Sequence, residues 1–198
     1  MSRYLVTGGS GRLGRSVVAV LAAAGHDVIS VDRMPHDAGA ARSVSFDLRD
    51  MSGTAELFAE VRPDSVIHLA AIAVPFGCPD AELYTTNTSL AFSVLEASVQ
   101  SGVSSLLFAS SPTVIGYGAP GGWEPSYLPL DEAHPLAPWN AYALSKQAVE
   151  GIAAMAVRVH GDRLRVGSFR PCYVIAPEEW EGAPTQQGHT VIERLDRP

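Results

Sequence analysis

A glycine-rich segment directly after a short apolar run is the feature that most constrains how this chain can fold. The apolar run Tyr4–Thr7 is followed by the glycine-rich segment Gly8–Gly14 and then by an alanine-rich stretch that suits a helix. Gly8 allows a tight turn, Gly11 presents a backbone without a Cβ to a pyrophosphate, and Gly14 lets helix and strand pack closely. A glycine triplet alone indicates only a turn, but this one stands between a strand and a helix. The spacing therefore predicts a unit that binds a dinucleotide.

Short β-branched runs alternate with longer alanine-rich stretches, which is the pattern of repeated strand-helix-strand units. The predicted strands are Tyr4–Thr7, Val28–Val31, Val44–Phe46, Val66–Leu69, Leu106–Ala109 and Val166–Phe169. The predicted helices are Arg12–Ala24, Thr54–Val61, Ala81–Gln100 and Pro138–His160. Because the strand sequences lack a polar face, we expect helices on both sides of the sheet. The predicted fold class is α/β, a doubly wound parallel sheet of the Rossmann type.

Composition and charge exclude several classes of function. The 14 Lys and Arg against 21 Asp and Glu leave a net charge of −7, which disfavours a nucleic-acid partner held by basic residues. Cys78 and Cys172 have no CxxC spacing and no histidine pair beside them, so we expect no metal site and a reducing compartment. The longest apolar run, Val17–Ala24, is too short to cross a bilayer, and the N-terminus reaches glycine too early for a signal peptide. We expect a soluble, cytoplasmic protein with no membrane partner.

The residue expected to choose between cofactors lies at the end of the second predicted strand. Asp32 follows Gly14 by about 18 residues, close to the usual spacing of about 20. Its carboxylate can accept hydrogen bonds from ribose hydroxyls and repels a 2′-phosphate, so it favours NAD over NADP. NADP stays open because Arg12 or Arg33 could pair with a 2′-phosphate, although either guanidinium could equally be solvated.

The end of the third predicted strand offers a further polar contact. Asp47 and Leu48 follow that strand and therefore lie at the same edge of the sheet as Asp32. Asp47 could bind the edge of an adenine, or it could simply cap the helix that follows. The sequence leaves both interpretations open.

Tyr142 and Lys146 lie four residues apart in the last predicted helix, so the phenol and the ammonium share one face. Lys146 is the only lysine, and the chain uses arginine at every other such basic position, which indicates that an ammonium is needed here. A surface pair at this spacing is the alternative interpretation. Because an ammonium stabilises phenolate, we expect Lys146 to lower the pKa of Tyr142 and let it exchange protons near neutrality.

Two hydroxyls follow the fifth predicted strand. Ser110 and Ser111 lie where the strand ends, and a loop rich in glycine and proline over residues 112–138 comes next. Folds of this class place ligands at the carboxyl edge of the sheet, where the glycine-rich segment also opens. Serines at a strand end often only form turns, but Tyr142 and Lys146 downstream favour a site.

Together these residues resemble the short-chain dehydrogenase/reductase superfamily, and specifically its extended branch, the NAD-dependent epimerase/dehydratase family. The resemblance runs from Tyr4 to about Pro177. The matching motifs are the loop Thr7–Gly14, Asp32, Asp47-Leu48, His68-Leu69-Ala70-Ala71, Asn87, Ser110-Ser111, the pair Tyr142 and Lys146, and Arg170-Pro171. The resemblance implies that Tyr142 is the general acid/base, that Lys146 holds the nicotinamide ribose, and that Ser111 polarises the substrate oxygen. The implied cofactor-binding residues are Gly8, Gly11, Arg12, Leu13, Asp32, Asp47, Leu48, Leu69, Ala70, Ala71, Asn87, Ser110, Tyr142, Lys146 and Pro171.

Departures from the family pattern narrow the expected reaction. Dehydratases of the family carry Thr-Asp-Glu where this chain has Ser111-Pro112-Thr113, so we expect no dehydration. Ile115 and Tyr173 replace residues that are usual in nucleotide-sugar enzymes. The leading hypothesis is an NAD(P)-dependent oxidoreductase that transfers hydride at a hydroxyl or carbonyl carbon of a sugar-like small molecule. The alternatives are a nucleotide-sugar epimerase and a non-catalytic NAD(P)-binding module.

The resemblance also implies a domain organisation and an assembly. We expect residues 1–175 to form a dinucleotide-binding domain with the catalytic residues, and residues 176–198 to be the start of an incomplete substrate-binding region. Extended members pair two helices across a two-fold axis, which implies a homodimer through Ala81–Gln100 and Pro138–His160. The second of these helices offers an apolar stripe that could serve the dimer or could face its own sheet: Val149, Ile152, Ala153 and Ala156.

Overall fold

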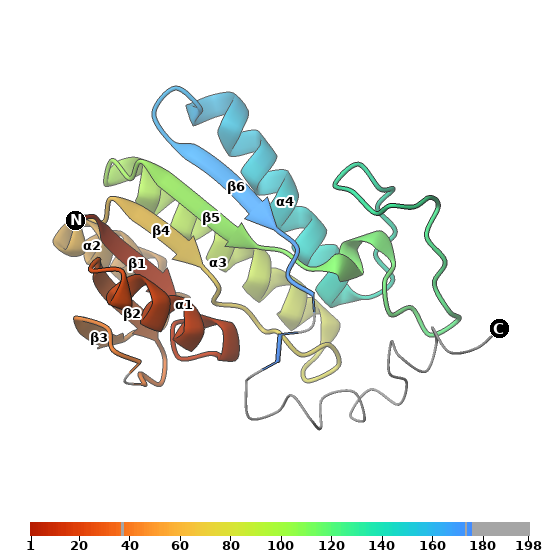
Figure 1. Ribbon diagram of the computed structural model, residues 1–198, viewed down its shortest axis with the longest axis horizontal. Helices are drawn as coiled ribbons and strands as arrows, with labels where there is room; N and C mark the ends of the chain where they lie inside the picture. The colour runs from red at the N-terminus through yellow and green to blue at the C-terminus, as the bar shows by residue number, and fades with distance from the viewer. Residues whose placement is uncertain (37, 173, 176–198) are drawn as a thin grey trace.

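Six parallel strands form one sheet with the order β3-β2-β1-β4-β5-β6 in the computed structural model (Figure 1). The structure describes residues 1–36, 38–172 and 174–175. The strands are β1 (Arg3–Thr7), β2 (Asp27–Asp32), β3 (Arg42–Ser45), β4 (Ser65–His68), β5 (Ser105–Ala109) and β6 (Arg165–Phe169). The helices are α1 (Arg12–Ala23), α2 (Met51–Val61), α3 (Asp80–Gln100) and α4 (Ala141–His160), with a 3₁₀ helix η1 (Pro112–Ile115). The predicted doubly wound parallel sheet is confirmed.

Two apolar cores lie on opposite faces of the sheet, because successive strand residues point to opposite sides. Leu5 belongs to a core that also contains Phe58 of α2 and Ala153 of α4, together with the inner side of α3. Val6 belongs to the other core, with Val18 of α1. The helices α2, α3 and α4 therefore cover one face and α1 covers the other (Figure 1).

The face that carries α1 is only partly covered within the described residues. Helix α1 packs against β1 and β2. On β5, Phe108 is fully buried, whereas its neighbour Leu107 on the other face is 37% exposed. Helices on both sides of all strands were expected, and for the α1 side of β5 this stays a prediction, because no helix among the described residues contacts Leu107 on that side.

The apolar stripe considered for a dimer faces inward. Val149, Ala153 and Ala156 of α4 are all buried and belong to the core beneath the sheet. The alternative interpretation is therefore correct for these residues. The large apolar side chains that are exposed on these two helices are instead Phe92 of α3 and Leu144, Val157 and Val159 of α4.

Two helices begin where a polar side chain caps them, which shifts their starts from the predicted positions. Helix α2 begins at Met51 rather than Thr54, because Asp50 accepts a hydrogen bond from the Gly53 backbone. Helix α4 begins at Ala141 rather than Pro138, because Asn140 accepts one from the Ala143 backbone at 2.7 Å. The second cap places Tyr142 in the first turn of α4.

Candidate active site

The glycine-rich segment packs so tightly at Gly8 and Gly14 that neither position has room for a Cβ atom. Gly8 has a φ of +69°, and a Cβ there would lie 2.6 Å from the Ala70 backbone nitrogen. A Cβ on Gly14 would meet the Gly8 carbonyl oxygen. Gly11 is the N-cap of α1, so the backbone of the segment lies at the positive end of the helix dipole. The backbone of Gly8 and Gly11, called the cradle below, suits the pyrophosphate of a dinucleotide.

Asp32 is held beside this cradle by backbone donors. Its Oδ2 accepts a hydrogen bond from the Ser10 nitrogen at 3.1 Å, and its Oδ1 accepts one from the Met34 nitrogen at 3.4 Å. Each carboxylate oxygen has a further lone pair. The carboxylate can therefore accept hydrogen bonds from ribose hydroxyls without moving.

A cavity of about 360 Å³ lies against the cradle and Asp32. The predicted cofactor residues that line it are Gly8, Gly11, Asp32, Asp47, Leu48, Ala70 and Ala71. The structure thus brings together the ends of β1, β2, β3 and β4, as the doubly wound topology requires. Arg33 and Arg49 also line this cavity.

Asp47 does not cap the following helix, since Asp50 does so. Its carboxylate is bound by Arg49, whose Nη2 lies 2.6 Å from Oδ2. This hydrogen bond lowers the pKa of Asp47 below its ordinary value, so the carboxylate stays ionised at the cavity wall. Arg49 was not among the predicted site residues, although a basic residue two positions after Asp47 was a visible signal.

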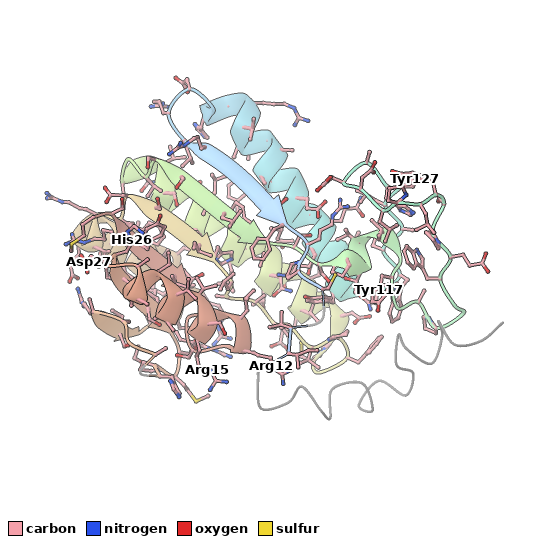
Figure 2. All side chains as sticks on the ribbon, viewed as in Figure 1. Arg12, Arg15, His26, Asp27, Tyr117 and Tyr127 are labelled. Carbon is pink, nitrogen blue, oxygen red and sulfur yellow. The ribbon has the colours of Figure 1, made fainter. Side chains whose placement is uncertain are left out.

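The remaining cofactor residues predicted from the family do not line this cavity. Arg12 donates to the Val174 carbonyl oxygen at 3.1 Å, which links the start of α1 to the chain beyond β6 (Figure 2). Asn87 is buried and accepts a hydrogen bond from the Ile72 nitrogen at 2.8 Å, so it fixes the chain after β4. Leu13, Leu69 and Pro171 are half-buried. Tyr173 lies outside the described residues.

Lys146 is buried at the end of β5. Only 6% of the residue is exposed, and its Nζ donates to the Ala109 carbonyl oxygen at 2.8 Å. Burial lowers the pKa of Lys146 to about 8. The pair of Lys146 with Tyr142 is therefore not a solvated surface pair.

The expectation that Lys146 lowers the pKa of Tyr142 is wrong. Burial of the phenol raises the pKa of Tyr142 above its ordinary value, and a hydrogen bond with Ser111 only partly opposes this. The Lys146 Nζ lies 5.7 Å from the centre of the Tyr142 ring and is bonded to Ala109, so its charge does not decide the outcome. The described chain holds Tyr142 as a neutral phenol at pH 7.

Ser111 has two roles that the sequence analysis treated as alternatives. It caps η1, where its Oγ accepts hydrogen bonds from the Thr113 nitrogen at 3.3 Å and the Thr113 hydroxyl at 2.9 Å. It is also the hydroxyl that bonds to Tyr142. The turn therefore fixes the hydroxyl next to the phenol.

Two further polar residues lie at the site: Glu150, which was not predicted, and His68, which was named in a family motif but given no role. Glu150 lies one turn beyond Lys146 and accepts a hydrogen bond from the Ser110 hydroxyl at 2.5 Å. His68 bonds to the Thr7 hydroxyl at 2.7 Å, and its burial lowers its pKa to about 3, so it is neutral. The spacing of Tyr142, Lys146 and Glu150 on one helix face was the signal that could have revealed Glu150.

Within the described residues, no group of three or more His, Cys, Asp and Glu side chains is placed to hold a metal ion. No described helix is both long enough and apolar enough to span a membrane.

Curated relatives of this chain are nucleotide-sugar epimerases. The UDP-glucose 4-epimerase of Lacticaseibacillus casei is 32% identical over 163 residues, which are 79% of this chain and 47% of the relative. The UDP-glucose 4-epimerase of Mus musculus is 33% identical over 171 residues, which are 76% of this chain and 47% of the relative. The chain thus spans about half the length of the curated relatives it matches.

Solved structures of UDP-glucose 4-epimerases are also similar to this chain. The UDP-glucose 4-epimerase of Thermus thermophilus, in complex with NAD, has a TM-score of 0.73 and 34% identity over 85% of this chain and 54% of its own. The enzyme from Brucella ovis, also with NAD, has a TM-score of 0.75 and 27% identity over 86% and 51%. A model of the NAD-dependent epimerase/dehydratase family matches residues 4–197. The chain therefore belongs to the NAD-dependent epimerase/dehydratase family.

Proposed function

We propose that this chain is the cofactor-binding and catalytic part of an enzyme that transfers hydride at a hydroxyl-bearing carbon of a sugar-like substrate, with NAD as cofactor. The observation that carries the proposal is the meeting of Ser111, Tyr142 and Lys146 at the end of β5, each held in place by a hydrogen bond. The family and its NAD-bound structural neighbours support the cofactor.

The residues present fit NAD. The cradle at Gly8 and Gly11 would accommodate a pyrophosphate, and Asp32, held by the Ser10 nitrogen, would accept hydrogen bonds from the adenosine ribose. The Asp32 carboxylate would lie close to a 2′-phosphate and repel it, which favours NAD over NADP. When bound, NAD supplies a hydride acceptor or donor at its nicotinamide ring.

The chain's own groups handle the proton. Tyr142 exchanges a proton with the substrate oxygen, and Ser111 holds that oxygen by a hydrogen bond. Because burial keeps the phenol protonated, Tyr142 starts as a proton donor in the reducing direction. Lys146, whose Nζ lies 5.7 Å from the centre of the Tyr142 ring, would bind the ribose of the cofactor through its ammonium.

Epimerisation of a nucleotide sugar is the second candidate, and the comparisons favour it at least as strongly as net oxidation. The curated relatives are UDP-glucose 4-epimerases, and a structural neighbour from Thermotoga maritima contains UDP-glucose. Oxidation and re-reduction at one carbon would use the same Ser111, Tyr142 and Lys146 without net change of the cofactor.

The proposal includes a homodimer built on α3 and α4. These helices pack against each other in one layer. Phe92 of α3 is 41% exposed and Leu144 of α4 is 47% exposed, so the layer presents apolar side chains away from the sheet. A second copy that covered them would form a four-helix arrangement.

The test uses the purified chain. NAD and NADP are titrated by calorimetry, and the chain is then incubated with NAD and either UDP-glucose or a panel of sugars and sugar acids. We expect tighter binding of NAD, and slow conversion of one substrate that disappears in Tyr142→Phe. Absence of NAD binding contradicts the proposal. Binding of NAD without any conversion that depends on Tyr142 favours the non-catalytic binding module.

A further inference from the structure

Glu150 continues the face of α4 that carries the catalytic pair. Tyr142, Lys146 and Glu150 are four residues apart, so they lie in one row along the helix. Glu150 Oε1 accepts hydrogen bonds from the Ser110 hydroxyl at 2.5 Å and from Arg170 Nε at 2.8 Å. Its Oε2 accepts one from Arg170 Nη2 at 2.9 Å.

This cluster is only partly exposed to water. The side chain of Glu150 is 16% exposed and that of Arg170 is 20% exposed, and Ser110 is 2% exposed. Burial alone would raise the pKa of Glu150, but the hydrogen bonds from Arg170 and Ser110 outweigh it, and the pKa lies below its ordinary value. The carboxylate is ionised and bidentate, which is the strong form of this interaction.

The row on α4 binds three consecutive residues at the end of β5. Lys146 binds the Ala109 carbonyl oxygen, Glu150 binds the Ser110 hydroxyl, and Tyr142 bonds to Ser111. Glu150 alone extends this hold to β6, because Arg170 directly follows that strand. The backbone adds one more link, from the Ser110 nitrogen to the Phe169 carbonyl oxygen at 2.7 Å.

In a doubly wound sheet the ends of β5 and β6 would face the second half of a bound dinucleotide. The cradle at Gly8 and the carboxylate of Asp32, at the ends of β1 and β2, take the pyrophosphate and the adenosine half. In a doubly wound sheet the other mononucleotide then extends across the ends of the strands on the far side of β1, which are β4, β5 and β6. Through Ser110 and Arg170, Glu150 therefore fixes the ends of β5 and β6, next to which the nicotinamide half would lie.

We propose that Glu150 is a positioning residue for the nicotinamide half of the site, acting through Ser110 and Arg170. This inference rests on the proposed function in taking NAD as the cofactor. A carboxylate that served only general stability would affect the whole cofactor site alike. A carboxylate that positions β5 and β6 changes the affinity for NAD but not the affinity for a ligand that occupies only the adenosine half of the site.

The experiment compares the affinities of NAD and ADP for Glu150→Gln and the unmodified chain, by calorimetry. The amide keeps one acceptor oxygen and turns an N–H₂ group toward donors, so the cluster loses a charged hydrogen bond. We expect NAD to bind about tenfold more weakly and ADP to bind unchanged. Equal weakening of both ligands, or no change in either, overturns the proposal.

Two further variants keep the result interpretable. Glu60→Gln is the matched control, because Glu60 pairs with Arg42 at 2.7 Å on the exposed surface of α2 and should alter neither affinity. Ser110→Ala removes one donor only, and it serves if Glu150→Gln fails to fold. It should lower the affinity for NAD by about threefold and leave the affinity for ADP unchanged. Equal effects on both affinities again overturn the inference. An unmodified chain that binds ADP but not NAD refutes the proposed function before any variant is compared, and this inference falls with it.

Discussion

The Nζ of Lys146 donates a hydrogen bond to the carbonyl oxygen of Ala109 at 2.8 Å, at the last residue of β5. The bond fixes the ammonium against the sheet edge and takes up one of its three donors. In the proposed function the other two donors would bind a ribose hydroxyl of the cofactor and face Tyr142, whose ring centre lies 5.7 Å away. The position thus requires a small cation with radially arranged donors.

Lys146→Arg should therefore fail although it keeps the charge. A planar guanidinium is larger than an ammonium, and the site leaves only 6% of Lys146 exposed. We expect NAD affinity to fall by about tenfold or more, with a matching loss of turnover. Calorimetry and a substrate assay measure the two effects. Arg158→Lys, at an exposed position on the same helix, is the control, and wild-type affinity in Lys146→Arg would contradict the assignment.

Tyr142→Phe separates proton transfer from cofactor binding. The substitution keeps the half-buried ring and removes only the hydroxyl that bonds to Ser111. Turnover should fall by roughly 10²- to 10⁴-fold, as expected for loss of a general acid/base. NAD affinity should stay within about twofold. Unchanged turnover on a verified substrate would show that Tyr142 is not the acid/base.

Burial of Lys146 should make stability rise with pH. Burial lowers the pKa of Lys146 from 10.5 to about 8. The unfolded chain keeps the ordinary pKa. Between about pH 8 and 10.5 it therefore binds more protons than the folded chain, and the free energy of unfolding increases with pH. Below about pH 8 the buried charge lowers the free energy of unfolding by about 3 kcal/mol, and this loss disappears as the pH rises to 10.5.

Urea unfolding of the chain and of Lys146→Met between about pH 7 and 10 measures this contribution. The free energy of unfolding of the unmodified chain should rise relative to that of Lys146→Met as pH increases, because only the unmodified chain carries the amine. The range stops at about pH 10 because Tyr142, whose pKa is raised, contributes with the opposite sign above it. A difference between the two chains that does not vary with pH would mean that the amine is solvated.

The choice of cofactor should depend on Asp32. Asp32→Ala removes the charge that repels a 2′-phosphate and leaves Arg33 at the cavity wall. We expect the ratio of NADP to NAD affinity to rise by about tenfold or more. Parallel calorimetric titrations measure this ratio. Tighter binding of NADP by the unmodified chain would show that Arg33 outweighs the carboxylate.

The sequence predicted those features whose cause is local. Gly8 must be glycine because its positive φ and its approach to Ala70 exclude a Cβ, and such a need is visible in the chain itself. The strands follow from short β-branched runs. The start of α2 was missed because a cap by Asp50 decides it, and a cap is a single side-chain hydrogen bond.

Features that depend on distant contacts could not be predicted. The raised pKa of Tyr142 results from burial, which neither the helix spacing nor the single lysine reveals. The link from Glu150 to Ser110 joins residues 40 positions apart. Apolar side chains lie on more than one face of α4, so only the packed fold shows that Val149 faces the core while Leu144 is exposed.

We expect two copies of the chain to associate through the outer side of α3 and α4. Phe92 and Leu144 are the apolar side chains that a second copy would cover, and a charge placed there would be buried without a partner. Phe92→Asp should weaken self-association by about a hundredfold or more. Sedimentation equilibrium at micromolar concentration measures it.

The matched control is Val20→Asp, because Val20 is 69% exposed on α1, on the opposite face of the sheet. It should leave self-association unchanged, whereas Phe92→Asp should yield monomers that still bind NAD, since Phe92 does not line the cofactor cavity. A dimer that persists in Phe92→Asp would place the interface elsewhere. A monomeric unmodified chain would remove the homodimer altogether.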